Sequence, residues 1–116
     1  MTKNRFAVVP VERRTMDGII FASKKEMLRY YDLKMLKMAN EISDLELQPK
    51  FPVFISSKTG MVPFCTYTAD FRYKLKDGTV VVEELKSTGT AKDAAYRLRR
   101  KAAEIFHGMK VNVIIK

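Results

Sequence analysis

The sequence predicts an α/β domain in which a mixed central sheet is flanked by helices. Its 116 residues suffice for one hydrophobic core, and 47% of them are hydrophobic. Two segments carry apolar residues at the three- and four-residue spacing of helices, and segments rich in β-branched and aromatic residues lie between them. Since no repeat or low-complexity tract divides the sequence, we expect a single domain over residues 17–116, preceded by an irregular segment at residues 1–16.

The first predicted helix runs from Ser23 to about Asn40, after a short strand at residues 19–21. Ser23 and Glu26 have the spacing of a capping box, in which each side chain bonds a backbone amide at the start of the helix. Four apolar residues at helical spacing form a stripe that we expect to face the core. The stripe consists of Leu28, Tyr31, Met35 and Ala39.

The middle of the chain predicts strands and a hairpin. Residues 42–47 alternate in part, Gln48-Pro49 breaks the pattern, and residues 51–55 resume it, as two short strands or one interrupted strand would. Residues 62–73 read as a further strand, and the Lys76-Asp77-Gly78 turn joins it to a returning strand over residues 79–85.

The second predicted helix runs from Ala91 to about His107, between a polar break at residues 87–90 and Gly108, which is a typical helix stop. Its apolar residues at helical spacing are expected to face the core. They are Ala91, Ala95, Leu98, Ala102 and Ile105. A final strand at residues 111–115 is aliphatic except for Asn112, which predicts burial on both of its faces.

The charge of the chain predicts a polyanionic partner. The sequence holds 22 Lys and Arg against 13 Asp and Glu, a net charge of +9. Nucleic acid is the usual partner of such a surface, because each cation near a phosphate releases a condensed counterion. An anionic membrane would favour a helix with a bulky apolar face opposite a basic face, and neither predicted helix has that combination. A basic domain without a polyanionic partner remains the alternative.

Several classes of site are excluded by residue types. The one cysteine, Cys65, cannot form an intramolecular disulfide, and the one histidine, His107, has too few partners for a Cys/His zinc site. We expect Cys65 in the core and His107 at a helix end. The sequence shows no Gly-rich phosphate loop, no apolar stretch of membrane-spanning length and no signal-peptide apolar region, so we expect a cytoplasmic protein without a nucleotide cofactor.

The residues with the clearest chemistry lie on either side of the predicted hairpin. Alternation along a strand puts Glu84 and Lys86 on one face and Glu83 on the other, and the hairpin brings Asp70 across from them. Two carboxylates are hard oxygen ligands for Mg²⁺, and a lysine can orient water and offset charge on a phosphate. The alternative is a surface charge pair of little energetic value. Glu83 is the second choice of ligand.

Asp70 and the Glu84-Leu85-Lys86 triplet together resemble the pattern of the PD-(D/E)XK nucleases, with Ala69 in the place of the family's proline. The predicted order of elements also resembles the superfamily's restriction-endonuclease-like αβββαβ core. More narrowly, three segments are similar to a family of small phage-encoded proteins of this superfamily, over most of residues 17–115. These segments are residues 21–26, residues 41–49 and residues 67–71.

The resemblance implies a DNA endonuclease that uses Mg²⁺, or Mn²⁺ in its place, held by Asp70, Glu84 and the backbone carbonyl of Leu85. It implies structured or branched DNA as the substrate, phage replication or recombination as the setting, and hence the host cytoplasm. A junction-resolving enzyme would need two active sites, so a homodimer is expected in that case. A catalytically inactive nucleic-acid-binding module on the same fold is the alternative.

Two further residues join the candidate site through the resemblance. A glutamate on the first helix often takes part in this superfamily, which implies a catalytic role for Glu26. Helical spacing puts Glu26 opposite the Leu28 stripe, so a solvent-facing capping residue is the other interpretation. Gln48 resembles the Gln-Pro of the phage group and would approach the metal or DNA, although an edge-strand glutamine is an equal explanation.

The second helix is basic and follows the triplet directly. We expect its cations to contact the DNA backbone, with a solvated helix face as the alternative. They are Lys92, Arg97, Arg99, Arg100 and Lys101. Thr88, in the turn before the helix, is expected to help hold a phosphate there.

Overall fold

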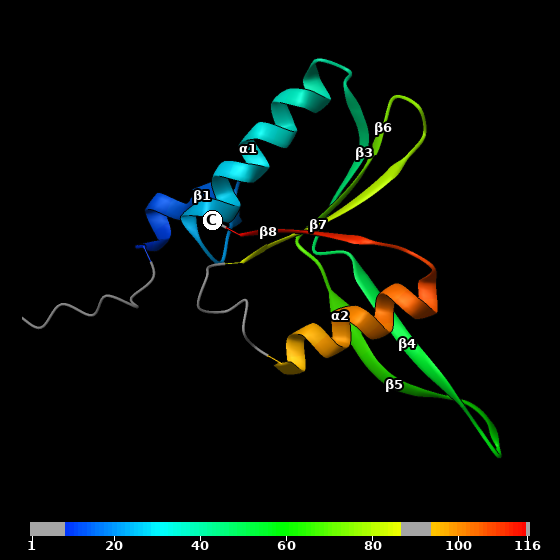
Figure 1. The fold of residues 1–116 in the computed structure, drawn as a ribbon. Helices are drawn as coiled ribbons and strands as arrows, with labels where there is room; N and C mark the ends of the chain where they lie inside the picture. Colours follow the sequence, from blue (N-terminus) through cyan, green and yellow to red (C-terminus); the bar gives the residue numbers. More distant parts are fainter. Residues whose placement is uncertain (1–8, 87–93, 116) are drawn as a thin grey trace, which may run out of the picture.

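The computed structural model describes residues 9–86 and 94–115, and these form a mixed α/β fold with two helices (Figure 1). The central sheet has the order β3-β6-β7-β8, with β8 parallel to β7 and the other neighbours antiparallel. The predicted α/β class with a mixed sheet is therefore confirmed. Its strands are β3 (Ile42–Leu47), β6 (Phe71–Leu75), β7 (Val80–Lys86) and β8 (Val111–Ile115).

A two-stranded ribbon of β4 (Lys50–Ser57) and β5 (Gly60–Thr68) leaves the sheet and extends away from it (Figure 1). The strand expected over residues 62–73 is therefore wrong as one strand, because it breaks at Ala69-Asp70. Gln48-Pro49 breaks the neighbouring chain at the same level, where Gln48 has a positive φ of 54°. The Gln48 amide donates to the Asp70 carbonyl (3.0 Å) and the Ala69 amide to the Pro49 carbonyl (3.1 Å).

Helix α1 (Lys24–Met38) begins at the predicted cap, since the Ser23 side chain accepts a hydrogen bond from the Glu26 amide (3.1 Å). The predicted core stripe is wrong: Leu28 and Met35 are 48% and 43% exposed. The face that packs on the sheet consists of Glu26, Met27, Tyr30 and Leu33. The helix carries apolar residues on two faces, so its periodicity alone could not select the one that packs.

Contacts of two neighbouring residues set the rotation of α1. The Tyr30 ring packs on Phe21, with centroids 5.1 Å apart, and its hydroxyl donates to Asp17 (2.8 Å). The preceding residue, Arg29, donates through Nε and Nη2 to the two carboxylate oxygens of Glu83, at 2.9 and 2.6 Å. Glu83 is only 2% exposed and also accepts from the Tyr73 hydroxyl. This Arg29–Glu83 pair fastens α1 to the face of β7 opposite Glu84.

Helix α2 (Ala94–His107) lies over the other face, against β4 and β5 (Figure 1). Most of the stripe predicted to face the core is wrong here too, because Leu98 and Ile105 are 65% and 73% exposed and Ala95 is exposed, while Ala91 lies outside the described residues. Of that stripe, Ala102 does pack against the core. The other inward positions are Tyr96, Arg100 and Ala103. A bulky basic residue, Arg100, thus takes a place on the packed face.

Strand β8 does not have two buried faces as expected. It is an edge strand beside β7, and although Val111 is buried, Ile115 is 56% exposed. Because β7 alternates, Val82, Glu84 and Lys86 face α2 while Glu83 faces α1. The candidate site therefore lies on the α2 side of the sheet.

The N-terminal part of the described chain is more regular than expected. A 3₁₀ turn, η1 (Val11–Arg14), leads into β1 (Thr15–Met16), which pairs with β2 (Ile19–Ile20). Arg14 donates to the carbonyl of Phe21 (2.6 Å), which holds this hairpin beside the start of α1. The irregular segment expected through residue 16 is wrong for these residues. Within the described ranges, no helix has the length and apolar character needed to cross a membrane.

The Arg29–Glu83 pair predicts a stability effect. Arg29→Leu would leave a buried carboxylate with too few donors, so we expect the free energy of unfolding to fall by about 2–4 kcal/mol. Adding Glu83→Gln removes the stranded charge while keeping an acceptor for Tyr73, and should restore more than half of the loss. Urea unfolding of both variants at one pH measures this, and a double variant as unstable as the single one would contradict it.

Candidate active site

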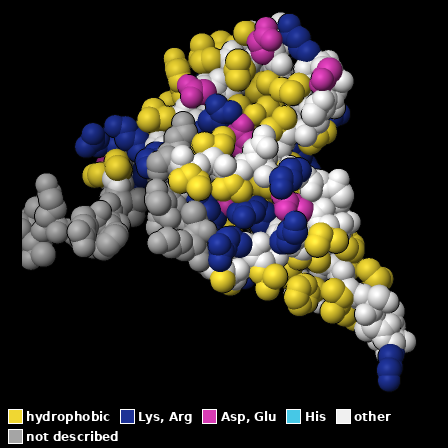
Figure 2. All heavy atoms as spheres, viewed as in Figure 1, with side chains coloured by type: hydrophobic (Ala, Val, Ile, Leu, Met, Phe, Trp, Pro, Cys, Tyr) yellow, Lys and Arg dark blue, Asp and Glu magenta, His cyan; other side chains and the backbone are white. Residues whose placement is uncertain are grey.

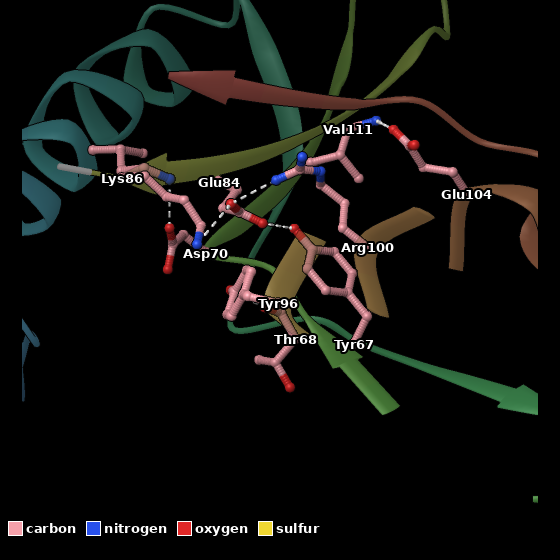
Figure 3. A network of polar contacts seen from close by, with 10 residues as sticks. Tyr67, Thr68, Asp70, Glu84, Lys86, Tyr96, Arg100, Glu104 and Val111 are labelled. Carbon is pink, nitrogen blue, oxygen red and sulfur yellow. Dashed lines mark hydrogen bonds and ion pairs between the residues drawn. The ribbon is translucent and has the colours of Figure 1, made fainter. Parts of the chain in front are cut away.

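Asp70, Glu84 and Lys86 meet at the end of β7 (Figure 3). Pairing between β6 and β7 ends at Phe71 and Glu83, while β7 continues to Lys86 beside β8. The Leu85 amide faces the place that β6 has left, and it donates to Asp70 Oδ2 (2.6 Å). A backbone amide that is shielded from water needs an acceptor. Because β6 begins only at Phe71 and gives the Leu85 amide no backbone partner, the Asp70 carboxylate accepts its hydrogen bond instead.

Glu84 is 1% exposed and held by two hydrogen-bond donors and an ion pair. Its Oε1 accepts from the Tyr67 hydroxyl on β5, and its Oε2 from Arg100 Nη1 on α2 (3.1 Å). Lys86 Nζ lies 3.8 Å from the same Oε2. These donors meet the requirement of a buried carboxylate for charged or polar partners. Burial and the Glu84 carboxylate together raise the pKa of Tyr67, which therefore stays a donor.

Lys86 is 8% exposed and lies over an aromatic ring. Its Nζ is 3.7 Å from the centroid of Tyr96, whose hydroxyl donates to the Thr68 carbonyl (3.0 Å). A cation over a ring face is attracted by the ring quadrupole. The ammonium is thus confined between Tyr96 and Glu84, at the side of the site away from Arg100 (Figure 3).

Glu26 is buried at 7% exposure, so the solvent-facing interpretation is wrong. Gln48 Nε2 donates to its Oε1 (3.0 Å), and both residues line a cavity of about 330 Å³ together with Asp70. Arg14 and Phe21 also line this cavity. Glu26 and Gln48 therefore lie beside Asp70, and the catalytic role of Glu26 and the metal or DNA contact of Gln48 stay predictions.

The carboxylates influence one another's protonation. Desolvation, and then the charge of Asp70, raise the pKa of Glu26 to about 7, against the hydrogen bond from Gln48. Desolvation also raises the pKa of Asp70, where the Leu85 amide and Lys86 act to lower it and Glu84 acts to raise it. Asp70 thus interacts electrostatically with Glu26 on one side and with the charged residues of β7 on the other.

The donor chemistry fits a hard divalent ion. Among residues 9–86 and 94–115, no three His, Cys, Asp or Glu side chains already stand close enough to hold a metal together. Mg²⁺, however, often takes only one or two carboxylates and fills its other positions with water and phosphate oxygens. Asp70 and Glu84 provide such carboxylates. The carbonyl of Leu85 should lie on the Asp70 side as well, because the amide and carbonyl of one strand residue face the same edge.

The remaining predicted residues have different outcomes. Arg97, Arg99 and Lys101 are exposed on α2, which both DNA contact and a solvated helix face predict, whereas Arg100 turns inward to Glu84. Thr88 and Lys92 lie outside the described residues. Sequence reasoning missed Tyr67 and Tyr96. Tyr96, Arg100 and Ala103 recur at helical spacing, but because Arg100 is charged, an apolar pattern does not single out this face.

Cys65 and His107 take structural positions. Cys65 is half-buried against the core under α2, as expected. His107 is the last residue of α2. Its ring packs edge-on against the Phe51 ring, with the ring centroids 5.6 Å apart, and its Nε2 lies 2.7 Å from the Pro52 carbonyl oxygen. These contacts join the end of α2 to the ribbon.

Comparison with known proteins gives one match. The model of a family described as "Protein of unknown function (DUF1064)" matches residues 10–116. No curated protein and no solved structure matches the chain. The matched range includes every residue of the candidate site.

Asp70 offers a test that separates its structural and chemical roles. Asp70→Asn keeps an oxygen acceptor for the Leu85 amide, so the free energy of unfolding should stay within about 1 kcal/mol of the wild type, while Asp70→Ala should lose about 1–3 kcal/mol. Both variants should lose Mn²⁺ binding in calorimetric titration. Equal instability of the two variants would contradict the role assigned to the Leu85 contact.

Glu26 predicts a pH-dependent stability. Its pKa is 4.5 in a model peptide and about 7 in the fold, so between these values the folded chain binds the extra proton. Stability contributed by Glu26 therefore falls as pH rises through this window. With chelator present, Glu26→Gln should gain free energy of unfolding relative to the wild type from about pH 5 to about pH 7, and then level off. Urea unfolding across that range measures the difference, and a pH-independent difference would contradict the assignment.

Proposed function

The chain belongs to the DUF1064 family, and we propose that it is a metal-dependent endonuclease that hydrolyses DNA phosphodiester bonds. The observation that supports this most is the meeting of Asp70, Glu84 and Lys86 at the end of β7, with Glu26 beside them. The order α1, β3, β6, β7, α2, β8 also agrees with a restriction-endonuclease-like αβββαβ core in which the β4–β5 ribbon is an insertion.

Each residue of the site has a distinct part in the proposal. Asp70, Glu84 and the Leu85 carbonyl would hold Mg²⁺ or Mn²⁺, which when bound supplies positive charge that offsets the charge developing on the phosphate. Lys86 orients the attacking water and stabilises the same developing charge through its ammonium. Glu26, with a pKa near neutrality, is suited to hold or release a proton near the reacting phosphate.

The partner in this proposal is DNA. The net charge of +9 and the exposed cations of α2 support a polyanion as the ligand. Branched or otherwise structured DNA is proposed by analogy with the phage proteins that the sequence resembles, and a homodimer and the cytoplasm belong to the same analogy. The single cysteine agrees with a reducing compartment.

The second candidate is a nucleic-acid-binding module that has this fold but no activity. The hydrogen bonds from Tyr67 and Arg100 to Glu84 favour it, because they occupy both oxygens of the carboxylate that would bind the metal. The two candidates predict the same salt-dependent DNA affinity. They differ in whether the DNA is cut.

Cleavage assays distinguish them. Supercoiled plasmid and synthetic four-way junctions are incubated with the protein and Mg²⁺ or Mn²⁺, with and without chelator. We expect metal-dependent nicking that falls at least about 100-fold in Glu84→Gln and in Lys86→Met, since each removes a group that acts on the reacting phosphate. Gel-shift affinity for the same DNA should change little.

Lys37→Gln, at the exposed end of α1, is the matched control for loss of one positive charge and should cut like the wild type. All variants are purified in parallel, so nicking that survives equally in Glu84→Gln indicates a contaminating nuclease. Binding without cleavage on every substrate and metal would overturn the enzyme and support the module. Absence of salt-dependent DNA binding would reject both.

A further inference from the structure

A basic groove lies between α2 and β8, next to the candidate active site. It encloses about 460 Å³, many times the roughly 30 Å³ of one liquid water. Its walls carry Arg97, Arg100 and Lys101 from α2 and Lys110 from the approach to β8, over a floor of Val111 and Val113. Figure 2 shows Lys and Arg side chains gathered where α2 meets the sheet. We call this the α2–β8 groove.

The charges of the α2–β8 groove are unbalanced. Among the described residues that line it, Glu104 is the one acid, and its Oε2 already accepts from the Val111 amide (2.8 Å). Four cations therefore face one engaged carboxylate. Arg97 and Lys101 are one turn apart, about 6 Å along the helix axis, so the positive charge is spread out rather than gathered at a point. Such a groove suits an extended anion better than a small one.

Arg100 is shared between the groove and the acidic site. It lines the groove, yet its Nη1 donates to Glu84 Oε2 at 3.1 Å, and 19% of its side chain is exposed (Figure 3). One guanidinium thus separates the two sites. A phosphate in the groove would compete with Glu84 for it, because charge-assisted bonds to either oxyanion are similar in kind.

We propose that the α2–β8 groove binds the phosphodiester backbone of DNA, and that Arg100 moves from Glu84 to a phosphate when the groove is filled. This inference rests on the proposed function, since the movement frees an oxygen of Glu84 for the divalent ion. DNA binding and metal binding are then coupled, and each must strengthen the other by the same factor.

The groove is tested by DNA affinity in the presence of chelator. Fluorescence anisotropy of a labelled duplex of about 20 base pairs is measured over a series of salt concentrations. Arg97→Gln and Lys110→Gln should each weaken binding about 3- to 10-fold at about 0.1 M salt and lower the log–log salt slope by about one. Lys37→Gln should change the affinity less than about twofold.

Two outcomes overturn the groove. If Arg97→Gln and Lys110→Gln behave like Lys37→Gln, the backbone lies elsewhere. If they lose affinity for inorganic phosphate but not for the duplex, the groove takes a small anion. Cleavage assays run beside these titrations test the proposed function separately. If the wild type nicks DNA with metal while Arg97→Gln and Lys110→Gln leave the duplex affinity unchanged, the groove is rejected and the proposed function stands.

The movement of Arg100 is tested by Ca²⁺ titration calorimetry with and without the duplex, whose integrity is checked on a gel. In the wild type, the duplex should tighten Ca²⁺ binding at least about fivefold. In Arg100→Met, Ca²⁺ should bind more tightly than in the free wild type, and the duplex should tighten it by a smaller factor than in the wild type, because only direct phosphate contacts to the ion then remain. An unchanged effect of DNA in Arg100→Met overturns the movement. Absence of any Ca²⁺ binding, with and without the duplex, overturns the movement, while the duplex affinities still decide the groove and Mg²⁺- or Mn²⁺-dependent nicking still decides the proposed function.

Discussion

The paired chain break at Gln48-Pro49 and Ala69-Asp70 is the constraint on which the site depends. Two backbone hydrogen bonds tie the breaks together, so the two chains leave the sheet side by side as the β4–β5 ribbon. Since β6 begins only after Asp70, β7 extends beyond its antiparallel partner. The Leu85 amide therefore has no backbone acceptor on β6 and donates to the Asp70 carboxylate. The divergent ribbon also offers α2 a surface, on which the Tyr96 hydroxyl reaches the Thr68 carbonyl. One bend thus positions both the acid and the helix that covers it.

Two adjacent buried glutamates on β7 show how environment separates structural from chemical roles. Both carboxylate oxygens of Glu83 accept hydrogen bonds from Arg29, and one of them also accepts from the Tyr73 hydroxyl. Glu84 has a single bond from Arg100, at 3.1 Å, and the Tyr67 hydroxyl. A two-point pair is stronger and more rigid than a single one. Glu84, which also lies next to Asp70 and Lys86, is therefore the carboxylate with more freedom to change partners.

The sequence predicted the two helices correctly and the buried face of each wrongly. In α1, the regular stripe through Leu28 and Met35 is exposed, and the face with Tyr30 and Leu33 packs instead. Periodicity measures only how regularly apolar residues recur. In α1 two faces meet this criterion, whereas the packed face of α2 includes Arg100, which an apolar pattern does not mark. Polar contacts then decide the rotation, as the Arg29 pair to Glu83 does for α1. The same choice of face underlies the interpretation of Glu26 as a solvent-facing capping residue, which was one of the two considered.

By itself the sequence determined the positions of the two helices, the cap at Ser23, the turn before β7, and the shared face of Glu84 and Lys86. All of these depend on the local geometry of one helix or one strand, which repeats over a few residues. Only the tertiary structure decided which helix faces pack, where β5 ends and β6 begins, and that Tyr67, Tyr96 and Arg100 surround the acids. Those outcomes depend on contacts between residues far apart in the chain, such as Asp70 with Leu85 and Arg29 with Glu83, which are 15 and 54 positions apart. Local periodicity carries no information about contacts at that separation.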